Sequence, residues 1–224
     1  MSLLFAWDID GTLLKSGGAG RSALDRAFTD CFGVAGVFES VDFRGRTDPS
    51  LIREAFQKAL RPFSDAEGEE LKEAYLKFLQ EELVRKSALM KVFPGVEEAI
   101  QATAQRGTNA LLTGNWAEGA RHKLSAAGLD HHFEWGAFGG DGPDRNALVP
   151  ALLKKAEQRG LAVDKVVVIG DTPADVACAR AGGALAVIVE TGSCEHEELE
   201  ATNPDLLLVD LQEGLGELLS FLDA

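Results

Sequence analysis

Residues 3–12 of the chain are LLFAWDIDGT, an apolar run that ends abruptly at Asp8, Asp10 and a glycine. An apolar run of this length beside a glycine turn predicts a buried parallel strand that is covered on both faces. Open α/β sheets bind their ligands beyond the carboxyl ends of the strands. The first strand is therefore expected to deliver two carboxylates to the place where a site would form.

Asp8 and Asp10 are two residues apart, so as strand side chains they would share one face. Carboxylates held that close repel one another, and either a bound cation or a shared proton would relieve the repulsion. A divalent metal with oxygen ligands suits such a pair, because Mg²⁺ is commonly held by one or two carboxylates together with water and phosphate oxygens. The alternative is an ordinary strand end with two solvated aspartates and a turn.

The composition limits the class of protein. The 224 residues are 46% hydrophobic, enough for a large core, and three separate cysteines favour a reducing compartment, so we expect a cytoplasmic protein. We expect no membrane segment, because no apolar stretch reaches spanning length. The net charge of −14 argues against nucleic acid as the partner. The sequence leaves open whether the protein is a monomer or a homodimer.

The hydrophobic pattern divides the chain into two parts. Residues 16–90 follow a glycine-rich stretch and carry only helical periodicity, including a long helix that begins at Ser64. Residues 91–224 alternate helical stretches with short apolar runs, of which 165–170 is the strongest. Such alternation predicts an α/β fold with a doubly wound parallel sheet. The helical part is therefore an insertion in an α/β domain formed by residues 1–15 and 91–224.

Polar residues follow three more of the predicted strands and are expected to meet Asp8 at one edge of the sheet. The Thr113 hydroxyl, followed by the amides of Gly114 and Asn115, can cradle a phosphate oxygen. Arg145 stands at the start of a helix, and Asp171 closes the strand expected beside the first one, where it would add a third carboxylate. Each feature is common alone, but the set in this order is specific.

In this arrangement the chain resembles the haloacid dehalogenase superfamily, in its phosphatase branch with a helical cap, of the phosphoglycolate-phosphatase-like type. The resemblance covers essentially the whole chain. The first family motif, D-x-D-G-T, matches residues 8–12; the second, a Ser or Thr at a strand end, matches Thr113; and the fourth, G-D-x-x-x-D, matches residues 170–175. Residues 16–90 match the inserted helical segment, called the cap below, and the remaining residues the core.

The resemblance implies a role for each motif residue. Asp8 would be the nucleophile that forms an aspartyl phosphate, and Asp10 the general acid and base. Mg²⁺ would be bound by Asp8, the main-chain carbonyl of Asp10, and Asp171, with Asp175 as a supporting residue rather than a ligand. The phosphate would be bound by the following residues: Gly11, Thr12, Thr113, Gly114, Asn115 and Arg145.

The chain departs from the family pattern at the third motif. The family places a Lys there, whereas the matching position of this chain is Arg145. Arginine keeps the charge and binds phosphate in a bidentate way, but the two residues are not interchangeable. Lys123, Lys154 and Lys155 fall at less suitable positions.

The cap and the charge predict the kind of substrate. A helical insertion at the mouth of a site encloses a small phosphorylated metabolite and excludes a macromolecule. In the cap, Arg44 and Arg46 flank a glycine turn and either reach the substrate or lie in a solvated loop.

Two other functions compete with a phosphatase. A sugar phosphomutase keeps both aspartates of the first motif, but the mutases that the chain resembles carry an Arg where this cap has Asp48. A phosphoryl-accepting regulatory module also uses an acidic cluster on a parallel sheet, but lacks such a helical insertion. We therefore expect a Mg²⁺-dependent phosphatase.

Overall fold

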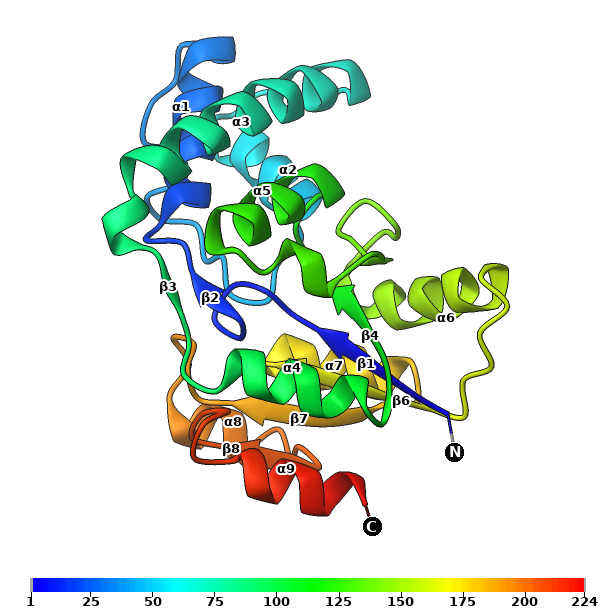
Figure 1. Cartoon of the computed structure of the whole chain (residues 1–224). Helices are drawn as coiled ribbons and strands as arrows, with labels where there is room; N and C mark the ends of the chain where they lie inside the picture. The colour runs from blue at the N-terminus through cyan, green and yellow to red at the C-terminus, as the bar shows by residue number, and fades with distance from the viewer. Residues whose placement is uncertain (1, 224) are drawn as a thin grey trace.

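The computed structural model describes residues 2–223, so Met1 and Ala224, the outermost residues of the predicted core, lie outside it. Its centre is a six-stranded parallel sheet in the order β5-β4-β1-β6-β7-β8 (Figure 1). The strands are β1 (Leu3–Trp7), β4 (Gly107–Leu112), β5 (Gly136–Ala137), β6 (Lys165–Gly170), β7 (Leu185–Val189) and β8 (Leu206–Leu208). The first strand of the sequence thus lies in the middle of the sheet, between β4 and β6.

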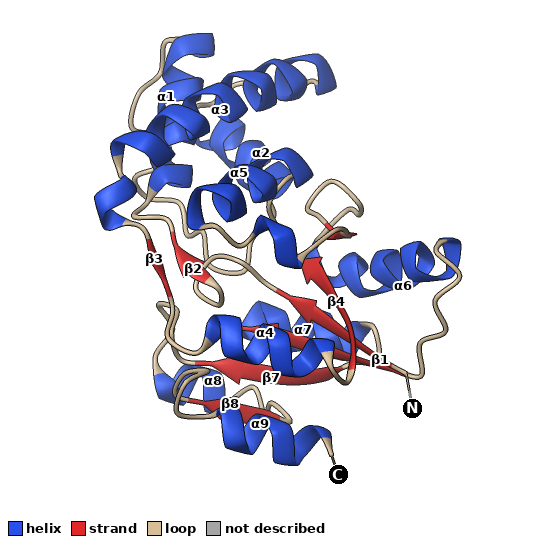
Figure 2. Ribbon diagram, viewed as in Figure 1, coloured by secondary structure: helices blue, strands red, loops and turns tan. Residues whose placement is uncertain are grey.

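Helices cover both faces of the sheet (Figure 2). One face packs against α4 (Val96–Ala104), α5 (Ala117–Ala127) and α9 (Leu215–Leu222). The other packs against α6 (Leu148–Gln158), α7 (Pro173–Ala181) and α8 (His196–Glu200). Short 3₁₀ turns occupy Asp130–His132 and, directly before α6, Arg145–Ala147. The predicted doubly wound α/β fold is confirmed.

The alternation of side chains along β1 explains its apolar run. Phe5 and Trp7 enter the hydrophobic cluster on one face of the sheet, while Leu4 and Ala6 enter the cluster on the other. All four side chains are fully buried. A strand covered on both faces has no polar side, so its first polar residue, Asp8, marks the point where it leaves the sheet.

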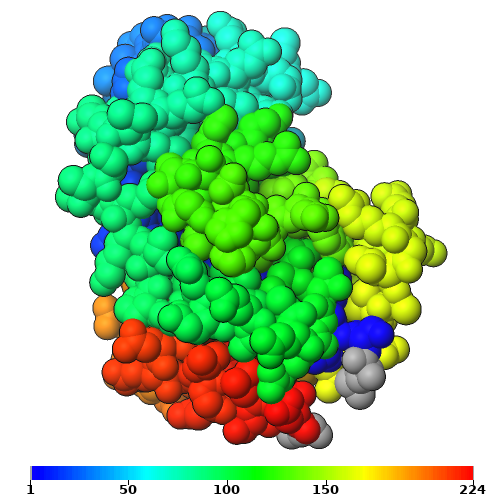
Figure 3. Space-filling view, viewed as in Figure 1, coloured from blue at the N-terminus to red at the C-terminus, as the bar shows by residue number. Residues whose placement is uncertain are grey.

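The cap lies between the two short strands β2 (Leu14–Lys15) and β3 (Lys91–Val92), which pair antiparallel. It contains α1 (Ala19–Phe32), α2 (Asp48–Lys58), α3 (Asp65–Arg85) and a 3₁₀ turn at Ser87–Leu89. These helices enclose their own hydrophobic cluster, rich in phenylalanine. In the space-filling view the cap, blue to cyan-green, rests against the green segment that holds α5 (Figure 3), and α3 packs on α5.

The element boundaries agree with the sequence pattern except at short elements. Strand β5 is only Gly136–Ala137, because just two of its residues pair with Leu111 and Leu112 of β4 before the chain turns away. The helix predicted to begin at Arg145 begins with a 3₁₀ turn, whose N-cap is the Asp144 side chain. No helix within residues 2–223 is long and apolar enough to cross a membrane.

Candidate active site

Asp8 lies at the carboxyl end of β1, in the centre of the sheet edge. Its backbone N–H donates to the carbonyl of Ile169 at 2.9 Å, which ties it to the end of β6. Its side chain is 7% exposed, and Oδ2 lies 3.0 Å from the Arg145 guanidinium. Burial raises the pKa of Asp8 to about 6, although Arg145 opposes the shift. The carboxylate is therefore desolvated and held by one cation.

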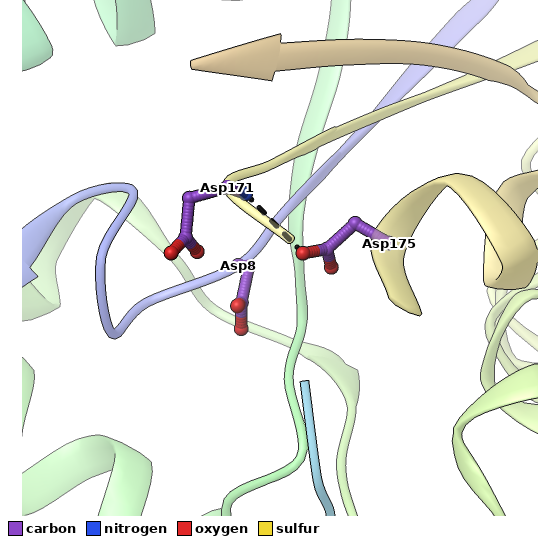
Figure 4. Close-up of side chains that lie close together, drawn as sticks. All are labelled: Asp8, Asp171 and Asp175. Carbon is purple, nitrogen blue, oxygen red and sulfur yellow. Dashed lines mark hydrogen bonds between the residues drawn. The ribbon is translucent and has the colours of Figure 1, made fainter. Parts of the chain in front are cut away.

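Asp171 follows β6 and lies beside Asp8 (Figure 4). The Thr12 hydroxyl donates to its Oδ1 at 3.1 Å. A Cβ added at Gly11 or Gly192 would come within 2.1 or 1.8 Å of Asp171 Oδ2, so only glycine leaves room for this carboxylate. Burial, together with the charges of neighbouring aspartates, raises the pKa of Asp171 well above its ordinary value. Two buried carboxylates thus face one another with little positive charge between them.

Asp175 completes the acidic cluster drawn in Figure 4, but its oxygens already have partners. Oδ2 accepts from the backbone N–H of Asp171 at 3.2 Å and of Thr172 at 3.0 Å, and from the Thr172 hydroxyl at 2.7 Å. Oδ1 accepts from Arg145. The capping box of α7 therefore turns Asp175 into a support for Asp171 and Arg145.

Arg145 is buried and links the two sides of this cluster. Its Nη2 contacts both Asp8 and Asp175, and these carboxylates outweigh burial, so the pKa of the guanidinium rises. The side chain also lines the site cavity, and its Nε is buried without a hydrogen-bond partner among the described residues. Arg145 is thus fixed at the position where a third-motif cation was predicted.

Asp10 belongs to a second cluster on the other side of the site. Its Oδ2 accepts from Asn115 Nδ2 at 2.9 Å and lies 2.5 Å from Lys123 Nζ. Asn115 Nδ2 also donates to the buried Thr113 hydroxyl at 2.8 Å, and Lys123 Nζ donates to Asn115 Oδ1 at 2.6 Å. The Asp10 carboxylate is therefore held in place by two segments, the second-motif loop and helix α5.

Both clusters line one cavity of about 300 Å³ between the core and the cap. Leu24, Phe43, Leu51 and Tyr75 contribute apolar surface from the cap. Asp48 joins the two parts: its N–H donates to the Gly114 carbonyl at 2.8 Å, and its Oδ2 accepts from the backbone N–H of Trp116 at 2.9 Å. Burial raises the pKa of Asp48 to about 6.

The two cap arginines line the cavity, but their guanidinium groups are paired elsewhere. Arg44 binds Asp42 and, across to the core, Glu198, each at 3.0 Å. Arg46, in the loop before α2, binds Glu54 of that helix at 2.9 Å. Neither is free for an anionic substrate in this arrangement.

The remaining candidates from the sequence are all found at or behind the cavity. Those that line it are Asp8, Asp10, Gly11, Thr113, Gly114, Asn115, Arg145 and Asp171. Thr12 and Asp175 do not line it, and each holds Asp171 instead.

Sequence reasoning missed the place of Lys123. The sequence gives this lysine a less suitable position for the third motif, yet the residue is 5% exposed and lines the cavity. A signal was present: Lys123 shares a helix face with Gly119, four residues earlier, and directly precedes the buried Leu124. A lysine on a buried helix face is rarely a solvated charge.

Known proteins are similar to this chain in sequence and in fold over most of its length. A sequence profile of haloacid dehalogenase-like hydrolases matches residues 5–180. Phosphoglycolate phosphatase 1 of Pseudomonas aeruginosa is 27% identical over 95% of this chain and 78% of its own length. Phosphoglycolate phosphatase of Vibrio vulnificus is 28% identical over 96% of both chains. β-Phosphoglucomutase of Clostridium difficile has the same fold, with a TM-score of 0.76 and 16% identity over 100% of this chain and 98% of that one.

The profile spans the strand that carries Asp8, the cap and the strand that carries Asp171. The similarity to the two curated phosphatases extends beyond it, through almost all of the chain. The chain therefore belongs to the haloacid dehalogenase-like hydrolases, and it is an enzyme of their phosphatase branch.

Proposed function

We propose that this enzyme is a Mg²⁺-dependent phosphatase that hydrolyses small phosphate monoesters through an aspartyl phosphate on Asp8. One observation carries the proposal: the Asp8 carboxylate is buried between Arg145 and Asp171, while Asp10 enters the same cavity. A nucleophile, a phosphate-binding cation, a metal ligand and a proton donor thus meet at one point.

The donor set fits Mg²⁺. Asp8 and Asp171 offer carboxylate oxygens within 4.8 Å of one another, and the flanking glycines keep the space around Asp171 clear. Oxygen donors of this kind suit a hard divalent cation. We assign Asp8, Asp171 and the Asp10 carbonyl as ligands. When bound, Mg²⁺ would neutralise the facing carboxylates and the charge of the phosphoryl group.

In the first half of the reaction an Asp8 oxygen attacks phosphorus, and the bond from phosphorus to the ester oxygen breaks. Asp10 gives its proton to the departing alkoxide, which leaves as an alcohol. Arg145 and the second-motif loop, with the Thr113 hydroxyl and the backbone N–H of Gly114, donate hydrogen bonds to the phosphoryl oxygens. The product of this half is an acyl phosphate on Asp8.

In the second half, water attacks phosphorus while Asp10 takes a proton from it. The bond between Asp8 and phosphorus breaks, inorganic phosphate leaves, and Asp10 is again protonated. Asp10 therefore acts first as an acid and then as a base. The cap limits the entry of other water during the cycle.

The size and walls of the cavity favour a small phosphorylated metabolite over a phosphopeptide or a nucleic acid end. A volume of about 300 Å³ lies at the small end of ligand sites. The curated relatives are named phosphoglycolate phosphatases, so a short phosphorylated acid is the first substrate to test. We infer a cytoplasmic enzyme that is a monomer or a homodimer, with no nucleic acid partner.

A phosphomutase is the weaker alternative. It must bind a second phosphate of its sugar at the cap, and cations are suited to that task. Here the cap offers the buried carboxylate of Asp48. Arg44 and Arg46 are paired with acidic residues, and Arg21, which also lines the cavity, donates to the Phe38 carbonyl. This arrangement favours net hydrolysis.

A screen of phosphorylated metabolites with and without Mg²⁺ tests the function. We expect release of inorganic phosphate from small monoesters, loss with a chelator and recovery with Mg²⁺. Acid-quenched enzyme should carry one phosphoryl group on Asp8, detected by mass spectrometry of peptides. Equal turnover in the chelator, or conversion of a sugar phosphate to an isomer without phosphate release, would contradict the proposal.

A further inference from the structure

We propose that Lys123 and Asn115 are positioning residues that fix the Asp10 carboxyl so that its Oδ1 exchanges the proton with the substrate. The inference rests on the proposed function and deepens it. It assigns a task to a buried lysine that lies outside all four of the motifs by which the chain resembles its family.

The hydrogen bonds around Asp10 are one-sided. Lys123 Nζ and Asn115 Nδ2 both donate to Oδ2, at 2.5 and 2.9 Å. No donor within residues 2–223 contacts Oδ1. Oδ1 is therefore the oxygen that these donors leave free to form a hydrogen bond with the substrate.

The two donors are themselves held in place. Lys123 Nζ also donates to Asn115 Oδ1 at 2.6 Å, and Asn115 Nδ2 also donates to the Thr113 hydroxyl at 2.8 Å. A half-turn of the Asp10 carboxyl about its Cβ–Cγ bond would only exchange the two oxygens. One oxygen would still bind Lys123 and Asn115, and the other would still occupy the free position, so the free position does not change.

The burial of Lys123 is explained by this task better than by stability. Its side chain is 6% exposed, whereas that of its partner Asp10 is 41% exposed. Removing an ammonium from water costs free energy that one half-exposed carboxylate and one amide oxygen do not recover. The cap provides the burial: a Cβ at Gly20 of α1 would lie 3.6 Å from Lys123 Nζ and 3.9 Å from the Tyr75 hydroxyl of α3.

The position matters at the two proton transfers. When the bond between phosphorus and the ester oxygen breaks, the proton on Oδ1 passes to the departing oxygen; when water attacks, Oδ1 receives its proton. Correct placement of an acid or base decides how much it contributes. Without Lys123 the Asp10 carboxyl has one donor instead of two and samples other rotamers.

A double-mutant cycle tests the inference. The variants are Lys123→Met, Asp10→Asn and both together, and kcat/KM is measured on an alkyl phosphate and on 4-nitrophenyl phosphate. We expect Lys123→Met to lose about 10²-fold on the alkyl phosphate and less than about threefold on the aryl one, which needs little acid assistance. In the Asp10→Asn background the further loss should be below about threefold, because Lys123 acts through Asp10.

Three comparisons separate positioning from a general structural effect. Lys123→Arg should recover part of the loss, since it restores a charged donor. Lys155→Met is the matched control, because Lys155 pairs with Asp141 at the same distance of 2.5 Å outside the cavity, and it should leave both rates unchanged. The dissociation constant of Mg²⁺, measured by calorimetry, should change less than about twofold in Lys123→Met, since Lys123 contacts neither Asp8 nor Asp171.

Two results would overturn the inference and make Lys123 a substrate-binding residue. One is a loss of kcat/KM in the double variant that equals the product of the two single losses. The other is an equal loss on both substrates with a raised KM. If Lys123→Met does not fold, Lys123→Gln supplies the same cycle. A parent enzyme without Mg²⁺-dependent hydrolysis would overturn the proposed function as well, whereas an active parent with multiplying losses overturns this inference alone.

Discussion

The core and the cap build opposite walls of one cavity. The core wall presents charged groups that are each held by at least one partner: the buried Asp8 by Arg145, the buried Asp171 by Thr12, and the half-exposed Asp10 by Lys123. The cap wall mixes apolar side chains with arginines that already have partners: Arg44 and Arg46 bind acidic residues, and Arg21 donates to the Phe38 carbonyl. The interlocked charged groups of the core cannot adapt to a new substrate, whereas a wall carried by a separate unit can. The contrast predicts that chemistry depends on the core and substrate choice on the cap.

The largest loss should come from the core nucleophile. We expect Asp8→Asn to lower kcat by about 10⁴-fold or more, because the amide neither attacks phosphorus nor neutralises a metal. Its thermal stability should be unchanged or higher, since a buried charge is removed. Asp141→Asn, at an aspartate outside the cavity, is the control. Residual activity within tenfold of the parent would remove Asp8 from this role.

Arg145 should show that the core wall depends on charge. We expect Arg145→Ala to lose about 10²-fold in kcat/KM, as when one preorganised donor is removed. It should also lower the free energy of unfolding by about 3–5 kcal/mol, because Asp8 and Asp175 remain buried without a cation. Arg145→Lys keeps the charge and should lose much less on both counts. If Arg145→Ala left kcat/KM unchanged, another cation would have to balance the charge of the phosphate, and Lys123 would be the first residue to test.

Asp48, the link between the walls, should respond to pH. Its pKa is about 6 in the folded protein against an ordinary 3.8, so the folded state keeps a proton that the unfolded state loses. Its contribution to stability is therefore greatest below about pH 4 and falls as pH rises to about 6, by at most about 3 kcal/mol. Asp48→Asn should remove this part of the pH dependence, measured by urea unfolding in a chelator. A parallel pH profile in parent and variant would contradict it.

The smallest effects should come from the cap arginines. Arg44→Ala and Arg46→Ala break ion pairs whose members are partly exposed, and such pairs contribute about 1 kcal/mol or less. We expect KM for small monoesters, charged or neutral, to change less than about threefold. A tenfold rise in KM for carboxylated substrates alone would show that an arginine leaves its partner to bind them, as the sequence first allowed.

The sequence predicted most of the fold and of the core wall, for a physical reason. Asp8, Thr113 and Asp171 each follow an apolar strand, and parallel strands bring their ends to one edge. Residues that directly follow these strands in the sequence are therefore expected to lie close together at that edge of the sheet.

The cap wall and Lys123 could not be predicted in this way. Lys123 reaches Asp10 from the middle of a helix, and the contact depends on the angle at which α5 crosses the sheet and on burial by Tyr75. The partners of Arg44 and Arg46 depend on loop paths, and Glu198 is 154 residues from Arg44. No local pattern encodes such contacts.

The paired strands β2 and β3 have a further consequence for how such an enzyme can change. Leu14 lies opposite Val92, so the chain leaves the core and returns to it at one place. An insertion whose two ends meet can be lengthened, shortened or exchanged without altering the register of the sheet, because the surrounding backbone is already closed beneath it. The residues between the two strands form a replaceable module, and one hydrolytic centre can serve successive substrates over evolutionary time.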